Sequence, residues 1–159
     1  MATNQRPTVM IVDDEEMVIT SINAFLQLET DYEVRGFTDP EEAVRHLRNG
    51  GADVVVSDYL MPKLNGIQLL GRAKELQPEA SRVLLTGHAD KQSAIQAINH
   101  VGLFQYLEKP WDNAQLLLVI NAGIERARLL RDLRNKISEL DAAHGSLKDV
   151  QRRLLQAFL

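Results

Sequence analysis

Five short apolar segments recur in the first two thirds of the chain, and a helix-like segment follows each of them. The apolar segments begin near Thr8, Tyr32, Val54, Arg82 and Phe104, at intervals of 22 to 28 residues. The first, third and fourth are almost entirely apolar, as expected for strands that are buried on both faces of a parallel sheet. The alternation predicts an α/β fold in which helices cover both faces of a five-stranded parallel sheet.

Capping residues indicate where several of the helices begin and end. Residues 39–42 (DPEE) combine an N-cap, a first-turn proline and a glutamate at the third helical position. Residues 49–51 (NGG) are typical of the end of that helix. Residues 112–115 (DNAQ) have the spacing of a capping box, so we expect a fifth helix to begin there.

This fifth helix has no stop signal where a compact domain would end. From Asp112 onward there is no proline, and the only glycines are Gly123 and Gly145. Leucine recurs every seven residues, which predicts one helix from Asp112 to Leu159 that pairs in parallel with a second copy. A helix that packs back on its own domain is the alternative. The expected dimer seam consists of Leu130, Leu133, Ile137, Leu140, Leu147 and Leu154, with His144 and Gln151 at polar seam positions.

The charge of the chain changes along its length. Residues 1–124 contain 10 Lys+Arg and 17 Asp+Glu, a net charge of −7, whereas residues 125–159 contain 8 and 5, a net charge of +3. This change predicts a domain at 1–124 and a helical coiled-coil linker at 125–159. Because acids are interleaved with the basic residues, a solvated helix face is favoured over a nucleic-acid surface, and we expect no direct contact with nucleic acid.

Composition excludes several other classes of protein. No apolar run is long enough to span a membrane, and residues 1–7 lack the apolar core of a secretory signal. Cysteine is absent, which rules out disulfides and thiolate metal sites. We therefore expect a cytoplasmic protein without membrane contact. The heptad pattern is still open at Leu159, so we also expect an output domain to follow it, although these residues do not identify that domain.

Side chains suited to phosphoryl transfer stand at the downstream ends of four of the apolar segments. Asp13-Asp14 follow the first segment, Asp58 follows the third, Thr86 ends the fourth and Lys109 follows the fifth. Because the carboxyl ends of parallel strands share one edge of a sheet, these groups should converge. Each of these groups, taken alone, could also have an ordinary structural role at a helix N-terminus, in a turn or as a cap. Their joint placement favours a common site.

The residue types suggest a role for each group. Asp58 stands alone at the end of the central strand and is the candidate nucleophile, which would form an acyl phosphate. Asp14 and Asp58 would bind Mg²⁺ (or Mn²⁺) directly, and Asp13 directly or through water. Lys109 could place a positive charge on a phosphate oxygen, and Thr86 could donate a hydroxyl hydrogen bond.

These residues resemble the receiver domain of bacterial two-component response regulators, over roughly residues 7–124. Residues 61–62 (MP) and 65–66 (NG) also match the loop that follows the acceptor aspartate in that family. The resemblance implies a flavodoxin-like, doubly wound sheet with an extended C-terminal helix. It implies phosphorylation of Asp58 by a sensor histidine kinase or a phosphotransfer protein. It also implies a signalling module whose only chemistry is Mg-dependent self-phosphorylation and self-dephosphorylation.

The resemblance also implies finer details of the site. The main-chain carbonyl of Leu60 would be a further metal ligand, and the peptide bond before Pro110 would be cis. Tyr106 would change its rotamer as Thr86 moves toward the phosphoryl group. Leu60 departs from the polar residue that many members carry, and we expect it to lengthen the life of the acyl phosphate. His88 is more typical of a loop residue than of a catalyst.

Three functions are compatible with these patterns. The first is a receiver that passes a conformational change through a dimeric linker to an output domain. The second is a phosphohydrolase with an aspartyl-phosphate intermediate, although that class carries a second aspartate where this chain has Leu60. The third is a scaffold that acts mainly by coiled-coil dimerisation, whose function Asp58→Ala would leave intact.

Overall fold

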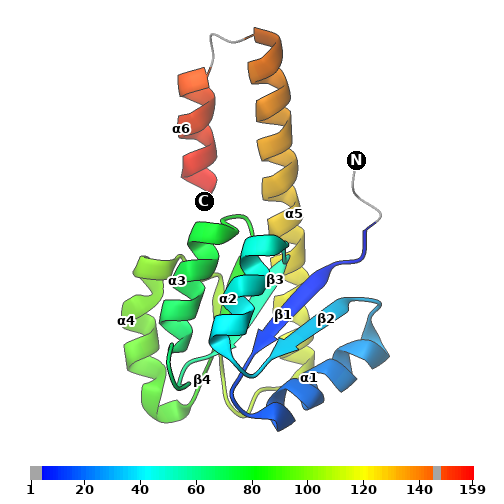
Figure 1. Ribbon diagram of the computed structural model, residues 1–159, viewed down its shortest axis with the longest axis vertical. Helices are drawn as coiled ribbons and strands as arrows, with labels where there is room; N and C mark the ends of the chain where they lie inside the picture. The colour runs from blue at the N-terminus through cyan, green and yellow to red at the C-terminus, as the bar shows by residue number, and fades with distance from the viewer. Residues whose placement is uncertain (1–4, 145–147) are drawn as a thin grey trace.

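The computed structural model describes residues 5–144 and 148–159 and confirms the predicted five-stranded parallel sheet (Figure 1). The sheet order is β2-β1-β3-β4-β5, and every neighbouring pair is parallel. The strands are β1 (Thr8–Val12), β2 (Glu33–Phe37), β3 (Val54–Asp58), β4 (Ser81–Thr86) and β5 (Gln105–Glu108). Since β3 is the central strand, its last residue, Asp58, lies in the middle of the carboxyl edge.

Helices cover both faces of the sheet (Figure 1). On one face lie α2 (Pro40–Asn49), α3 (Gly66–Leu76) and α4 (Lys91–Val101), the last preceded by the short 3-10 helix η1 (His88–Asp90). On the other face lie α1 (Glu16–Glu29) and the first part of α5 (Asn113–His144). Successive residues of β1 enter opposite cores, so period-two alternation places a fully buried side chain on each face.

Capping interactions set two of the helix starts. Asp39 is the N-cap of α2, as predicted, and its Oδ1 accepts a hydrogen bond from Glu41 N at 3.0 Å. A reciprocal capping box at α3 was not predicted: Gln68 N donates to Asn65 Oδ1 at 2.8 Å, and Asn65 N donates to Gln68 Oε1 at 2.9 Å. This box fixes the end of the loop that follows Asp58.

The C-terminal helix differs from the prediction. The helix α5 ends at His144, and α6 (Lys148–Phe158) lies beside α5 instead of continuing it to Leu159 (Figure 1). The residues between the two helices, 145–147, lie outside the described residues; in the sequence they include Gly145, a residue of low helix propensity. The C-terminal segment thus does not form one helix: α6 packs on α5, and it is α5 that packs on β3 and β4 of its own domain.

The expected seam residues fall into three groups by burial. Leu130 is buried, and Leu133 and Ile137 are half-buried. Leu140 and Leu154 are each 49% exposed, so the packing of α6 beside α5 leaves part of the seam open to solvent. Leu147 lies outside the described residues, and the side chain of His144 is likewise not described.

The solvated basic face expected on the linker is modified by three arginines that contact the domain, although the Arg134 side chain keeps 52% of its surface exposed. Arg128, Arg131 and Arg134 turn back toward the sheet and form hydrogen bonds or ion pairs with it and with the segment before β1. Two carboxylates on the sheet's amino edge attract them, which charge counting along the chain could not show. None of the described helices is long and apolar enough to pass through a membrane.

Candidate functional site

Three carboxylates meet at the carboxyl edge of the sheet. Asp13 and Asp14 follow β1, and Asp58 ends β3; one oxygen of each lies within 4.8 Å of the others. Asp13 is fully buried, Asp58 is 7% exposed and Asp14 is exposed. The cluster thus has a buried base and an open side at which a ligand could enter.

Lys109 reaches this cluster from the end of β5. Its Nζ lies 3.0 Å from Asp58 Oδ1 and 3.2 Å from Asp13 Oδ2. The backbone holds the residue in place, because Lys109 N donates to the carbonyl of Thr86 at 2.8 Å. The peptide bond between Lys109 and Pro110 is cis.

Burial raises the pKa of both Asp13 and Asp58. The charge of Asp58 adds to the shift at Asp13, while the hydrogen bond from Glu15 N and the ammonium of Lys109 oppose it. At Lys109 burial favours the neutral amine, but the hydrogen bonds and charges of Asp58 and Asp13 outweigh it, so the pKa of the amine is raised. Three carboxylates face one ammonium, and the cluster therefore keeps an excess of negative charge.

The donor set fits a hard divalent cation. Carboxylate oxygens are the ligands that Mg²⁺ and Mn²⁺ prefer, and a cation would relieve the mutual repulsion of the acids. Asp14 offers an exposed oxygen beside two buried ones, which leaves room for water in the coordination sphere. The residues present are therefore compatible with the expected metal.

Thr86 and Tyr106 lie on adjacent strands, Thr86 as the last residue of β4 and Tyr106 within β5. Thr86 is fully buried, and its Oγ1 donates to the carbonyl of Gly87 at 2.7 Å. Tyr106 is half-buried and packs against the core beneath α2, α3 and α4. Both lie where the sequence predicted, with the hydroxyl of Thr86 engaged by the main chain.

The loop after Asp58 is held by a close backbone approach. A Cβ on Gly66 would lie 2.8 Å from Leu84 Cδ1 and would overlap the carbonyl oxygen of Asp58. Gly66 N also donates to the carbonyl of Tyr59 at 2.8 Å. The motif at residues 65–66 includes this glycine, but its steric role was not predicted from the sequence. Leu60 is 61% exposed beside the site, and the side chain of His88 is not described.

A family model described as "response regulator receiver domain" matches residues 9–121. Among curated proteins, FixJ, a transcriptional regulatory protein of Bradyrhizobium diazoefficiens, is 28% identical over 151 residues, which are 95% of this chain and 73% of FixJ. HoxA, a hydrogenase transcriptional regulatory protein of the same species, is 27% identical over 90% of this chain. This chain spans only 29% of HoxA and 30% of PgtA from Salmonella typhimurium.

Solved structures show the same similarity. The signal receiver domain of an HD domain-containing protein from Pseudomonas fluorescens superposes with a TM-score of 0.77 at 30% identity, covering 83% of this chain and 96% of that one. A response regulator receiver domain protein from Clostridium thermocellum gives a TM-score of 0.72 at 32% identity, covering 78% and 98%.

Proposed function

The chain belongs to the response regulator receiver domain family, and on that premise we propose that Asp58 accepts a phosphoryl group in the presence of Mg²⁺. Receiver domains are signalling modules that act with histidine kinases or phosphotransfer proteins. The observation that carries the proposal is the position of Asp58 at the end of the central strand, 3.0 Å from Lys109 and beside Asp13 and Asp14.

The reaction is a displacement at phosphorus. One carboxylate oxygen of Asp58 forms a bond to phosphorus, the bond from phosphorus to the donor breaks, and its electron pair leaves with the donor. Asp13, Asp14 and Asp58 would hold the metal, which neutralises the phosphoryl oxygens when bound. Lys109, which already lies between two carboxylates, is placed to bind a phosphoryl oxygen once Asp58 has become an acyl phosphate.

The conformational response would start at Thr86. Its hydroxyl donates to a main-chain carbonyl in the free protein, so a dianionic phosphoryl group would be a stronger acceptor that competes for the same proton. Movement of Thr86 would let Tyr106, which lies on β5 two residues before Glu108, the register partner of Thr86, turn inward. The surface formed by α4 and β5 would then differ between the two states.

We further propose that the linker, residues 125–159, pairs with a second copy and carries the change to an output domain. Exposed apolar side chains at Leu140, Leu154 and Phe158 support this proposal, because 49%, 49% and 54% of their surface remains open to solvent. An output domain is compatible with the small share of HoxA and PgtA that this chain spans.

The two competing functions are less well supported. A phosphohydrolase of the aspartyl-phosphate type would need an acid at the position of Leu60, whose apolar side chain lies exposed there instead. A constitutive scaffold would not need three clustered carboxylates, two of which, Asp13 and Asp58, have their pKa raised by burial.

Mass spectrometry tests the proposal directly. The protein is incubated with acetyl phosphate and Mg²⁺, and we expect the mass of one phosphoryl group to be added. Asp58→Ala should remove the addition, whereas Asp31→Asn, a change at an exposed acid, should retain it. A phosphoryl group that still appears on Asp58→Ala, or appears fully with a chelator present, would refute the assignment.

A further inference from the structure

Two buried carboxylates lie at the amino edge of the sheet, opposite the candidate acceptor. Asp53 directly precedes β3, Glu79 lies shortly before β4, and each residue is only 5% exposed. A buried carboxylate is strongly unfavourable unless a cation or several hydrogen-bond donors accompany it. These two acids therefore need cationic or hydrogen-bonding partners, which the neighbouring elements supply.

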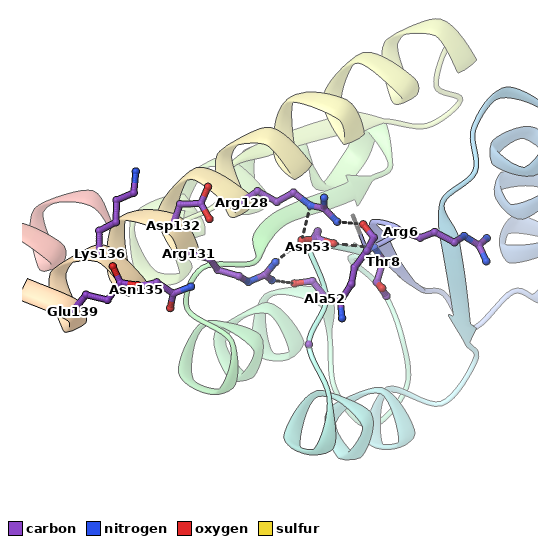
Figure 2. A pocket seen from close by; sticks show the side chains of 12 residues that line it. Arg6, Thr8, Ala52, Asp53, Arg128, Arg131, Asp132, Asn135, Lys136 and Glu139 are labelled. Atoms are coloured by element: carbon purple, nitrogen blue, oxygen red, sulfur yellow. Dashed lines mark hydrogen bonds and ion pairs between the residues drawn. The ribbon is translucent and has the colours of Figure 1, made fainter. Parts of the chain in front are cut away.

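Asp53 is bound by the backbone of β1 and by α5, as Figure 2 shows. Its Oδ2 accepts a hydrogen bond from Thr8 N at 2.8 Å, and its Oδ1 pairs with Arg131 Nη1. The second guanidinium nitrogen of Arg131 donates to the carbonyl of Ala52 at 2.6 Å. Arg128 lies 3.7 Å from the same carboxylate and donates to the carbonyl of Gln5 at 2.7 Å.

Glu79 receives the next arginine along the same helix. Arg134 Nη1 lies 2.7 Å from Glu79 Oε2. Arg131 and Arg134 are three residues apart, so they project from one side of α5 and reach two neighbouring strand starts. The fork of Arg131, which contacts a carboxylate and a carbonyl together, is a geometry that lysine cannot reproduce.

Close packing brings α5 to this edge about two turns before Arg131. Ser81 Oγ, at the start of β4, donates to the carbonyl of Gly123 at 2.7 Å. A Cβ on Gly123 would lie 3.0 Å from Val54 Cγ2 and 3.2 Å from Ser81 Cβ, so the helix backbone lies directly on β3 and β4. The helix then contacts the edge from Gly123 to Arg134, beyond residue 121 where the family match ends.

We propose that Asp53 and Glu79 form a docking site for the arginines of α5, and that this site fixes the direction in which the linker helix leaves the domain. The helix through Arg134 is then part of the same rigid body as β3 and β4. A linker fixed in this way transmits a rotation of the domain to whatever follows it, whereas a freely hinged helix would not. The proposal concerns the unphosphorylated protein and does not depend on phosphorylation of Asp58.

Distances between two spin labels test the proposal. The natural chain has no cysteine, so Glu42→Cys on α2 and Ser138→Cys on α5, both exposed positions, give a uniquely labelled pair. Labelled protein is diluted into unlabelled protein, so that distances between two copies do not contribute. We expect one narrow distance distribution in the parent and a distribution about twofold broader, or shifted, in Arg131→Gln/Arg134→Gln.

A matched control removes two exposed arginines elsewhere, Arg45→Gln/Arg72→Gln, and should leave the distribution unchanged. The acid-side pair Asp53→Asn/Glu79→Gln should broaden it as much as the arginine-side pair does. A variant that combines both pairs of substitutions should show no further broadening of the distance distribution, because the same contacts are lost. Additive broadening, or a parent distribution retained without the arginines, would overturn the proposal. Circular dichroism checks that each variant is folded. If Arg131→Gln/Arg134→Gln unfolds, Arg131→Lys/Arg134→Lys, which keeps the charges, replaces it, and we expect this variant to show a distance distribution of intermediate width.

Discussion

Asp53 and Asp58 stand at opposite ends of the same buried strand, one directly before the first residue of β3 and the other as its last. Asp58 pairs with Lys109 at the carboxyl edge, and Asp53 pairs with Arg131 at the amino edge. All five residues of β3 are buried. The proposed phosphoryl chemistry and the proposed docking of the linker therefore share a single structural element.

Binding of beryllofluoride with Mg²⁺, a mimic of the phosphoryl group, should move Thr86 and Tyr106. The hydroxyl of Thr86 should exchange the carbonyl of Gly87 for a fluoride, because the anion is the stronger acceptor. NMR of the free and bound protein would report both side chains. The switch would be rejected if both keep their free-state positions in the bound protein.

Leu60→Asn should shorten the life of the acyl phosphate several-fold. An amide can hydrogen-bond an attacking water and orient it toward phosphorus, whereas the leucine side chain cannot. The rate of phosphate release from the purified phosphoprotein measures the effect. Leu118→Asn, a similar change at a leucine 69% exposed on α5, serves as the control and should leave the rate unchanged. Faster release from the natural protein would contradict the prediction.

Asp58→Asn should stabilise the fold without metal. Burial raises the pKa of Asp58 in the folded state, so ionisation opposes folding; this penalty is absent below the unfolded-state pKa and grows as pH rises through the folded-state pKa. At neutral pH we expect Tm to rise by a few degrees, which about 1 kcal/mol produces at this chain length. Mg²⁺ should stabilise the natural protein more than the variant. Thermal unfolding with and without Mg²⁺ measures both effects, and a lower Tm for Asp58→Asn would be the contrary result.

Gly66→Ala should destabilise the fold by about 1–3 kcal/mol, the usual cost of overpacking. The added methyl would overlap the carbonyl of Asp58 and press on Leu84, so the acceptor strand must shift. Gly71→Ala is the matched control in the same helix, because its Cβ would meet nothing nearer than Val101 Cγ1 at 3.7 Å. That change should be neutral or stabilise by about 0.5–1 kcal/mol. Urea unfolding compares the two, and equal effects would refute the steric argument.

Dimerisation through the linker should depend on the seam beyond Lys136. The full chain should show a dimer mass at high concentration, whereas a version that ends after Lys136 keeps the arginine contacts and should remain monomeric. Leu140→Asp should weaken the dimer because Leu140 is an exposed seam residue, while Leu129→Asp, 69% exposed and off the seam, should not. Light scattering over a concentration series measures this. A shortened version that dimerises equally well would place the interface on the receiver.

The features that sequence predicted well depend on local patterns. The apolar runs of β1, β3 and β4 had no other plausible placement, and parallel connections then required Asp13, Asp58 and Thr86 to share one edge. The direction of the Thr86 hydroxyl was not predictable, because a threonine can bond the main chain or a ligand with similar ease.

The long-range ion pairs and the course of the linker could not be predicted from local sequence patterns. Arg131 and Asp53 are 78 residues apart, and nothing local to either residue signals the other. A heptad pattern marks an apolar stripe but not its partner, which can be a second chain or a neighbouring helix of the same chain, so it could not predict that α6 lies beside α5. Only the low helix propensity of Gly145 pointed to the interruption.

The contacts between α5 and the amino edge of the sheet bear on where this receiver can be joined to another protein. A fusion made at residue 121, where the family match ends, would leave Asp53 and Glu79 buried without their arginines. A fusion made after Arg134 would carry the receiver together with its own exit helix. Under the proposed docking, a transplanted form of this receiver should therefore be cut downstream of the ion pairs that Arg131 and Arg134 make.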